Sequence, residues 1–376
     1  MATPVISITD LYHPPEDPGD NFDLVLPFGS DRVDLRGVIL DGSIEKREAI
    51  VGGVEGYPGP RDPGVIPVSQ LNAIFGTNVP YGVAPFARMG NLGDRMEDVP
   101  RFQQTGIDLL LRLLAESKEP VHLMCFGSAR PLAVALNRDP ALLHEKVARV
   151  HLSAGSTTLD YLEWNVYLDP IAMRRVVDSG LPLSLYPCAT GIDCYSYDAH
   201  NTYWKLNDLQ WIEQMHPALR GYMLYGLGRS DRVDFLRALD EEPRSEVKAE
   251  VYGRHHAVWE TAAWMLVGGY ELVRHGDGSY EITPKENVAP TDTVILNRQI
   301  PCKVASHASG LYTFTISGDP ADSQVTIFER GDTAEYELAL QSALPKLYQS
   351  FTPKAWQGTT TGTRLDNPPP TYAGPL

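Results

Sequence analysis

The amino-acid sequence predicts an α/β protein with an open, mostly parallel sheet flanked by helices. Short apolar runs that suit buried strands alternate with segments whose apolar residues recur at helical spacing. This alternation is typical of βαβ units, in which a helix connects one parallel strand to the next. A later β-rich stretch, residues 280–328, and a helix over residues 332–351 predict a small β-rich and helical C-terminal part.

The expected elements follow one another along the chain. Residues 5–8 form the first strand candidate, a helix is expected to begin at Asn21 after a loop over residues 11–20, and residues 35–40 form a second strand candidate. The apolar run 121–126, closed by Gly127, fits a buried parallel strand, and Pro131 can open the next helix. Further strands are expected over residues 147–152 and 181–186. The aromatic residues between 195 and 240 predict helices with an aromatic face, which packs into the core or forms a binding wall.

Composition and charge narrow the class of protein. The chain has 376 residues with a formal net charge of -16, which disfavours nucleic acid and anionic membrane surfaces as partners. The four cysteines are too scattered for a disulfide framework, and no apolar run approaches the roughly 20 residues that span a bilayer. We therefore expect a cytoplasmic protein with one α/β domain over residues 1–351 and a Pro/Thr/Gly-rich tail over residues 352–376.

The densest cluster of chemically active side chains follows the first strand. It consists of the carboxylates Asp10, Glu16, Asp17, Asp20 and Asp23. Open α/β sheets bind ligands beyond the carboxyl ends of their strands, and crowded carboxylates suit a hard cation such as Ca²⁺. A solvated acidic turn is the alternative, because Asp-Pro-Gly-Asp is also good turn chemistry. The composition of this loop alone leaves both interpretations open.

Five segments, in order along the chain, resemble the inosine–uridine nucleoside hydrolases. In that family the first strand leads into Asp-x-Asp-Pro-Gly-x-Asp-Asp, and the run Asp17-Pro-Gly-Asp20 is similar to it. The other four similar segments are Phe126-Gly-Ser-Ala-Arg-Pro-Leu-Ala, His151-Leu-Ser-Ala-Gly, Glu163-Trp-Asn-Val-Tyr-Leu-Asp-Pro and His255-His-Ala-Val. The resemblance implies a nucleoside-hydrolase-like fold and hydrolysis of the N-glycosidic bond of a nucleoside or related ribosyl compound.

The resemblance also implies roles for individual residues. A metal-activated water would attack the sugar, with Asp17 as the base and His255 as the acid for the leaving group. The implied metal ligands, for Ca²⁺ in the family, are Asp10, Asp17, Asp20, Asn21, the carbonyl of Phe126, and His256. The implied substrate contacts are Glu163 and Asn165 to the sugar and Tyr222 and Tyr225 to the base. The resemblance further implies a homodimer or homotetramer.

The sequence departs from the family pattern at two places. Six residues separate Asp10 from Asp17 where the family has one, so the paired aspartates are aligned with Asp20 and Asn21, and Asp23 is the fallback. His256 stands where the family has a calcium-binding aspartate, and imidazole suits Zn²⁺, Mn²⁺ or Fe²⁺ better than Ca²⁺. The alternative function is therefore a metal-free, catalytically inactive nucleoside- or sugar-binding protein on the same fold.

Overall fold

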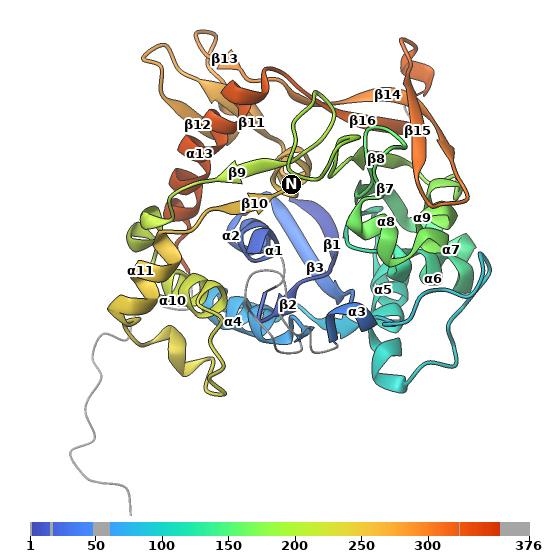
Figure 1. Cartoon of the computed structure of the whole chain (residues 1–376), viewed down its shortest axis with the longest axis horizontal. Helices are drawn as coiled ribbons and strands as arrows, with labels where there is room; N and C mark the ends of the chain where they lie inside the picture. The colour runs from blue at the N-terminus through green and yellow to red at the C-terminus, as the bar shows by residue number, and fades with distance from the viewer. Residues whose placement is uncertain (1, 16–17, 48–60, 323, 354–376) are drawn as a thin grey trace, which may run out of the picture.

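The structure is a computed structural model that describes residues 2–15, 18–47, 61–322 and 324–353. Its central feature is a nine-stranded sheet with the strand order β15-β14-β16-β8-β7-β6-β1-β3-β5 (Figure 1). All neighbours from β16 to β5 are parallel, and β14 and β15 are antiparallel additions at one edge, which confirms the predicted mostly parallel sheet. In chain order the strands are β1 (Thr3–Thr9), β3 (Val33–Leu40), β5 (Tyr81–Val83), β6 (Val121–Phe126), β7 (Val147–Ser153), β8 (Leu183–Tyr186), β14 (Asn297–Ser306), β15 (Tyr312–Ile316) and β16 (Val325–Arg330).

Helices cover both faces of this sheet, because alternate side chains of each strand point to opposite faces. Leu123 and Cys125 of β6 pack into one core cluster, and Met124 and Phe126 pack into the other. The first cluster is completed by α5 (Thr105–Glu116), α6 (Arg130–Arg138), α7 (Pro140–Lys146), α8 (Trp164–Leu168) and α9 (Pro170–Val177). The second is completed by α1 (Pro18–Asp23), α2 (Val25–Gly29), α4 (Val65–Phe75), α10 (Pro217–Leu227), α12 (Thr261–Val267) and α13 (Thr333–Ser350).

Smaller elements surround the main sheet (Figure 1). Three small sheets are formed by β2 (Tyr12–His13) with β4 (Asp62–Pro63), by β9 (Trp204–Leu206) with β10 (His256–Val258), and by β11 (Tyr270–Arg274) with β12 (Tyr280–Pro284) and β13 (Thr293–Val294). The other α-helices are α3 (Ile44–Arg47) and α11 (Ser245–Tyr252). The predicted β-rich stretch and final helix are confirmed by β12 to β16 and α13. The predicted tail lies outside the described residues from 354 onward.

Two local predictions were wrong. The stretch predicted as a loop before Asn21 contains β2, and the helix begins earlier, at Pro18, and breaks after Asp23 into α1 and α2. The aromatic stretch predicted as helical has no helix over residues 187–203, and Trp204 lies in β9. Side-chain to backbone bonds hold this loop instead, since Asp198 Oδ1 accepts from the backbone N–H groups of His200 (2.7 Å) and Asn201 (3.0 Å). Only α10 fulfils the helical prediction.

Candidate functional site

The carboxyl ends of β1, β3 and β6 bring two aspartates and a main-chain carbonyl together. Asp10 follows β1, Asp41 follows β3, and Phe126 ends β6. The backbone N–H of Asp10 donates to the carbonyl of Phe126 at 3.5 Å. A Cβ atom at Gly127 would lie 2.6 Å from Asp41 Oδ2 and 3.4 Å from Asp10 Cβ, so only glycine allows this close approach. Both aspartates are buried, and they form the floor of the candidate site.

Helix α1 adds Asp20 and Asn21 to this neighbourhood. Thr9, the residue before Asp10, donates from Oγ1 to Asp20 Oδ1 at 3.2 Å, and both Asp20 and Asn21 are buried. Asp17, the predicted base, lies outside the described residues, as does Glu16. Asp20 therefore lies next to the last residue of β1, and Asp10 lies next to Phe126.

Glu163 and Asn165 lie beside the end of β7. Glu163 caps α8 and accepts backbone N–H groups from Gly155 (2.8 Å), Asn165 (2.9 Å) and Val166 (3.3 Å). Burial raises the pKa of the Glu163 carboxyl to about 7, against the lowering effect of these bonds. Asn165 Nδ2 donates to the carbonyl of Ser153 at 3.1 Å. Both side chains are therefore fixed by the turn that follows β7.

The two neighbouring histidines differ in environment. His255 is exposed, whereas His256 is buried at the start of β10 with its ring 5.9 Å from that of Phe22 in α1. Burial lowers the pKa of His256 to about 4, so its imidazole is neutral at pH 7. Its Nε2 is buried and has no hydrogen-bond partner within the described part of the chain. A neutral ring nitrogen in this state can bind a metal ion.

Tyr222 and Tyr225 of α10 contact Asn21 and His13 of the segment from Asp10 to Asp23, which is called the carboxylate loop from here on. The buried Tyr222 hydroxyl donates to the main-chain carbonyl of Asn21 at 3.1 Å. The Tyr225 hydroxyl donates to the carbonyl of Arg232 at 2.6 Å, and its ring stacks on His13 with centroids 5.0 Å apart. These contacts order the loop that carries Asp20 and Asn21.

Sequence reasoning missed a buried ion network at the same edge. Arg130 Nε lies 2.9 Å from Asp169 Oδ2, and Arg130 Nη1 lies 3.6 Å from Asp41 Oδ1. Asp41 also accepts the Ser128 backbone N–H at 2.7 Å, and burial raises the pKa of its carboxyl. Asp41 directly follows the second predicted strand. This position could have identified it from the sequence, because ligands of open α/β sheets bind beyond the carboxyl ends of the strands, where Asp10 also lies.

Sequence reasoning also missed Glu260, which lies near Asp23, the fallback residue of the carboxylate cluster. Thr261 Oγ1 donates to Asp23 Oδ1 at 2.8 Å. Burial first, and then the nearby charge of Asp23, raise the pKa of the Glu260 carboxyl well above its usual value. Two carboxyl groups in one buried place are most stable when they share a proton.

The donor atoms at this edge of the sheet are oxygens, which are the type of ligand that suits a hard cation. Carboxylate oxygens of Asp10 and Asp20 and the carbonyl of Phe126 are the ligands that Ca²⁺ prefers. Within the ranges that the structure describes, however, no group of three or more His, Cys, Asp or Glu side chains could hold a metal ion. In those same ranges no helix is long and apolar enough to cross a membrane.

Comparisons with known proteins agree with this architecture. Residues 51–278, more than half of the chain, match the family model described as inosine-uridine preferring nucleoside hydrolase. A stretch of 83 residues is 39% identical to the pyrimidine-specific ribonucleoside hydrolase RihA of Enterobacter sp. (strain 638) and 36% identical to that of Escherichia coli (strain SMS-3-5 / SECEC). It covers 21% of this chain and 26% of each relative, so the chain matches about a quarter of the length of these relatives.

A solved structure with the same fold is an inosine-guanosine nucleoside hydrolase. It superposes with a TM-score of 0.50 at 12% identity, covering 92% of this chain and 99% of that one. At this identity the likeness supports the fold alone.

Proposed function

Because the chain belongs to the inosine-uridine preferring nucleoside hydrolase family, we propose that it hydrolyses the N-glycosidic bond of a nucleoside or related ribosyl compound. The observation that carries the proposal is the group of Asp10, Asp20 and the Phe126 carbonyl at the carboxyl edge of the sheet, linked through Thr9. This is where open α/β sheets bind their ligands.

A divalent cation would be held by oxygens of Asp10, Asp17, Asp20 and Asn21, by the Phe126 carbonyl, and by His256. When bound, it lowers the pKa of a water molecule and orients the sugar hydroxyls. The carboxylate donors favour Ca²⁺, whereas the neutral, buried imidazole of His256 favours Zn²⁺, Mn²⁺ or Fe²⁺.

The chain's own residues would supply the rest of the chemistry. Asp17 would remove the proton of the attacking water. Glu163 and Asn165 would bind the ribose hydroxyls, and their fixed positions beside β7 support this role, since rigid groups bind at a lower cost in entropy. The exposed His255 would protonate the leaving base, against which Tyr222 and Tyr225 would lie.

The alternative is a metal-free, inactive nucleoside-binding protein. Two observations favour it: His256 replaces a carboxylate ligand, and the side-chain Oδ1 of Asn21 lies 3.4 Å from the Tyr222 hydroxyl, which engages it within the protein. A cation would then have to compete with that contact.

The test measures ribose release from a panel of purine and pyrimidine nucleosides together with the metal content of the pure protein. Asp17→Asn should abolish both hydrolysis and metal retention, because Asp17 is proposed as ligand and as base. Asp31→Asn, at an exposed carboxylate outside the site, is the matched control and should change neither.

Asn165→Ala separates substrate binding from metal binding. It should retain the metal and weaken substrate binding about ten- to a hundredfold, the effect of one or two buried hydrogen bonds. If no nucleoside is hydrolysed and no metal binds after calcium soaking, the metal-free binding protein is the better description.

A further inference from the structure

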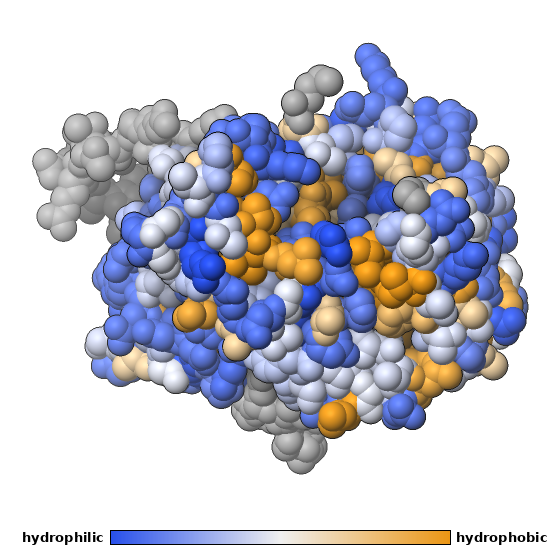
Figure 2. Space-filling model, turned by 90° about the horizontal axis from the view of Figure 1, so that it is seen from above, coloured by the Kyte–Doolittle hydropathy of each residue, from blue (hydrophilic) through white to orange (hydrophobic). Residues whose placement is uncertain are grey.

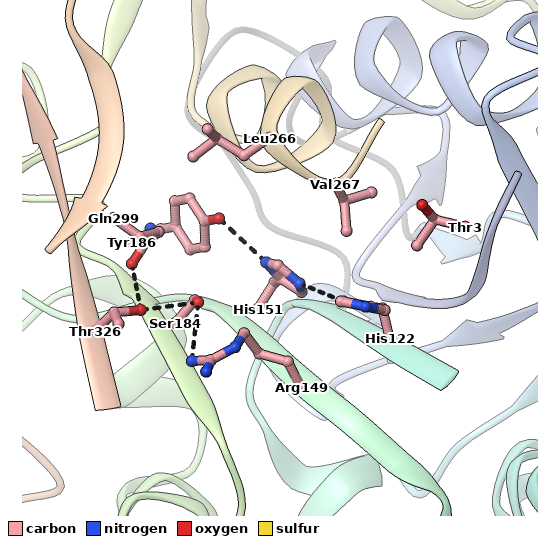
Figure 3. Close-up of a pocket in the computed structure, with 10 residues that line it drawn as sticks. All are labelled: Thr3, His122, Arg149, His151, Ser184, Tyr186, Leu266, Val267, Gln299 and Thr326. Atoms are coloured by element: carbon pink, nitrogen blue, oxygen red, sulfur yellow. Dashed lines mark hydrogen bonds between the residues drawn. The ribbon is translucent and has the colours of Figure 1, made fainter. Parts of the chain in front are cut away.

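A hollow of about 370 Å³ lies on the sheet face that α12 covers (Figure 3). Its floor comes from β1, β6, β7, β8, β14 and β16, and Leu266 and Val267 at the end of α12 stand opposite the floor. The floor residues are Thr3, His122, Arg149, His151, Ser184, Tyr186, Gln299 and Thr326. Its volume lies within the range of small-molecule pockets.

This hollow is separate from the carboxylate edge. His122 stands four residues before Phe126 on β6, which corresponds to about 13 Å along an extended strand. Thr3, Ser184 and Thr326 are likewise first or second residues of their strands, whereas His151 stands two residues before the end of β7 and Tyr186 ends β8. Most of the floor therefore lies toward the amino ends of the parallel strands, and the proposed nucleoside site lies beyond their carboxyl ends.

The floor is polar where a covered sheet face is usually apolar. On the same face, Met124, Phe126 and Phe328 pack into the core cluster. Buried polar groups cost free energy unless they are hydrogen-bonded, so a polar floor calls for partners.

One set of partners is a chain of three rings. The Tyr186 hydroxyl lies 3.1 Å from His151 Nδ1, and His151 Nε2 lies 2.9 Å from His122 Nδ1 (Figure 3). Burial lowers the pKa of both imidazoles and raises that of the phenol, so all three rings are neutral at pH 7. Protons can be ordered along this chain in either direction. When Tyr186 donates to His151, and His151 to His122, the His122 Nε2 carries a proton and is a donor.

A second set of polar side chains finds its partners within the floor. Ser184 Oγ and Thr326 Oγ1 lie 3.0 Å apart, and Thr326 donates to Gln299 Oε1 at 2.8 Å. The Gln299 side chain is also hydrogen-bonded to Tyr186. Arg149 Nη1 donates to the Leu183 carbonyl at 2.9 Å, which fixes the guanidinium beside Ser184.

The charge of the lining points to the ligand class. Of the ten described residues that line the hollow, Arg149 is the one with a permanent charge, and none is a carboxylate, although the whole chain has a net charge of -16. An arginine with amide, imidazole and hydroxyl donors suits an oxyanion. We propose that this hollow is a second ligand site, which binds a small organic molecule through a phosphate or carboxylate group held by Arg149, with His122 Nε2, on the neighbouring strand in register with Arg149, as a further donor.

The bound oxyanion would also set the direction of the ring chain. An acceptor at His122 Nε2 selects the arrangement in which Tyr186 donates to His151 and His151 donates to His122. Binding should therefore be visible as a change in the tautomer of two histidines.

Isothermal titration of the full chain with inorganic phosphate and with acetate, against sodium chloride at equal ionic strength, tests the site. We expect saturable binding of at least one of the two anions, and the stronger one identifies the ligand group. Arg149→Gln should weaken that binding about ten- to a hundredfold, the effect of losing a charge-assisted contact. Arg175→Gln is the matched control, since Arg175 is another half-buried arginine, bonded to Asn137 Oδ1 at 2.7 Å outside the hollow.

Three further measurements keep the test decisive. His122→Phe removes a donor without removing a charge and should also weaken binding, which keeps the proposal testable if Arg149→Gln does not fold. Asn165→Ala should leave anion binding unchanged, which makes the result independent of the proposed hydrolase. Long-range proton–nitrogen spectra of histidine-labelled protein should show the tautomer change on anion addition. Absence of saturable binding, or binding that neither Arg149→Gln nor His122→Phe weakens, would overturn the proposal.

Discussion

At Glu163, burial and hydrogen bonding act on one carboxyl group in opposite directions. Three backbone N–H groups favour its ionised form, and removal from water favours its neutral form more strongly, which gives a pKa of about 7. The residue therefore titrates near neutral pH while it holds the turn between β7 and α8. A change in pH should act on the candidate site through the stability of this turn.

We predict a pH-dependent stability that depends on Glu163. The native pKa of about 7 exceeds the ordinary value of 4.5, so the native state binds more protons than the unfolded state between these values. The contribution of Glu163 to the free energy of unfolding is then largest below pH 4.5 and falls by about 3 kcal/mol as the pH rises through 7. Urea unfolding at several pH values should show this fall in the wild type relative to Glu163→Gln.

Glu246→Gln, at an exposed glutamate of α11, is the control for this experiment and should keep the pH profile of the wild type. Parallel profiles for the wild type and Glu163→Gln would contradict the prediction.

The buried imidazole of His256 leads to a second prediction. Its neutral state at pH 7 contributes no charge to a cation, whereas a carboxylate at the same position would. His256→Asp should therefore raise calcium affinity, measured by isothermal titration, if the alignment with the family is correct. His255→Asp places the same charge one residue away on an exposed side chain and should have a smaller effect. Equal effects of both substitutions would show that only net charge matters.

Among the helices and strands, α12 connects the two regions discussed above. At its first residue, Thr261 Oγ1 accepts the Trp204 Nε1–H of β9 at 3.2 Å and donates to Asp23 Oδ1 of α1 at 2.8 Å. At its last residues, Leu266 and Val267 cover the hollow. The helix therefore stands between the carboxylate loop and the proposed anion site.

We predict that Thr261→Val destabilises the protein by about 1–3 kcal/mol, because the indole N–H of Trp204 then loses a buried acceptor at nearly unchanged side-chain volume. Urea unfolding monitored by tryptophan fluorescence measures the loss. Thr313→Val, on the exposed side of β15, is the matched control and should change stability little. A loss no larger than that of the control would mean that this bond is not important for stability.

The elements also show what the sequence could and could not predict. Buried parallel strands are continuous apolar runs, so β6 was predicted with its observed bounds, and β1, β3, β7 and β8 within a few residues. The strands β9 and β10 have three residues each and are too short for a periodic pattern. The loop over residues 187–203 is set by Asp198 and by Arg330, which lies 132 residues further along the chain.

The candidate site, like the strands, could be predicted from the sequence only in part. Asp10 and Asp20 lie next to a strand that could be recognised, and the structure brings them together. Asp41 was missed although it directly follows a predicted strand, and its partner Arg130 comes from a helix that no local pattern links to it. The polar floor was missed because His122 interrupts an apolar run by a single residue, and only the sheet places it opposite Arg149 and within reach of His151 on the next strand.

For the whole molecule, exposed apolar side chains favour association. Hydrophobic patches lie between charged residues on the face shown in Figure 2. The loops after β7 and β8 pair through Ser156 and Ala189, and these loops together with α8 carry several exposed apolar side chains, called here the exposed apolar surface. Its exposed residues are Leu159, Leu162, Trp164, Tyr167, Ile192, Tyr195 and Tyr197. Such surfaces commonly mark protein–protein contacts.

We therefore propose a homodimer or homotetramer that uses this surface. Light scattering after size-exclusion chromatography should give a mass two or four times that of one chain. Ile192→Lys, at a side chain that is 76% exposed, should shift the equilibrium toward the monomer. Val233→Lys, at a side chain that is 93% exposed outside this surface, is the control. A monomer at micromolar concentration would contradict the proposal.

The place of β16 in the sheet has a consequence for synthesis on the ribosome. This strand lies between β8 and β14 in the sheet, yet 138 residues (187–324) separate Tyr186 at the end of β8 from Val325 at the start of β16. At about 5–20 residues per second, the nascent chain needs roughly 7–28 s to cover that distance. Throughout that time β8 is an open sheet edge, the kind of surface that chaperones cover on unfinished chains. Arrested nascent chains that stop before β16 should therefore be cleaved by protease far faster than chains that include it.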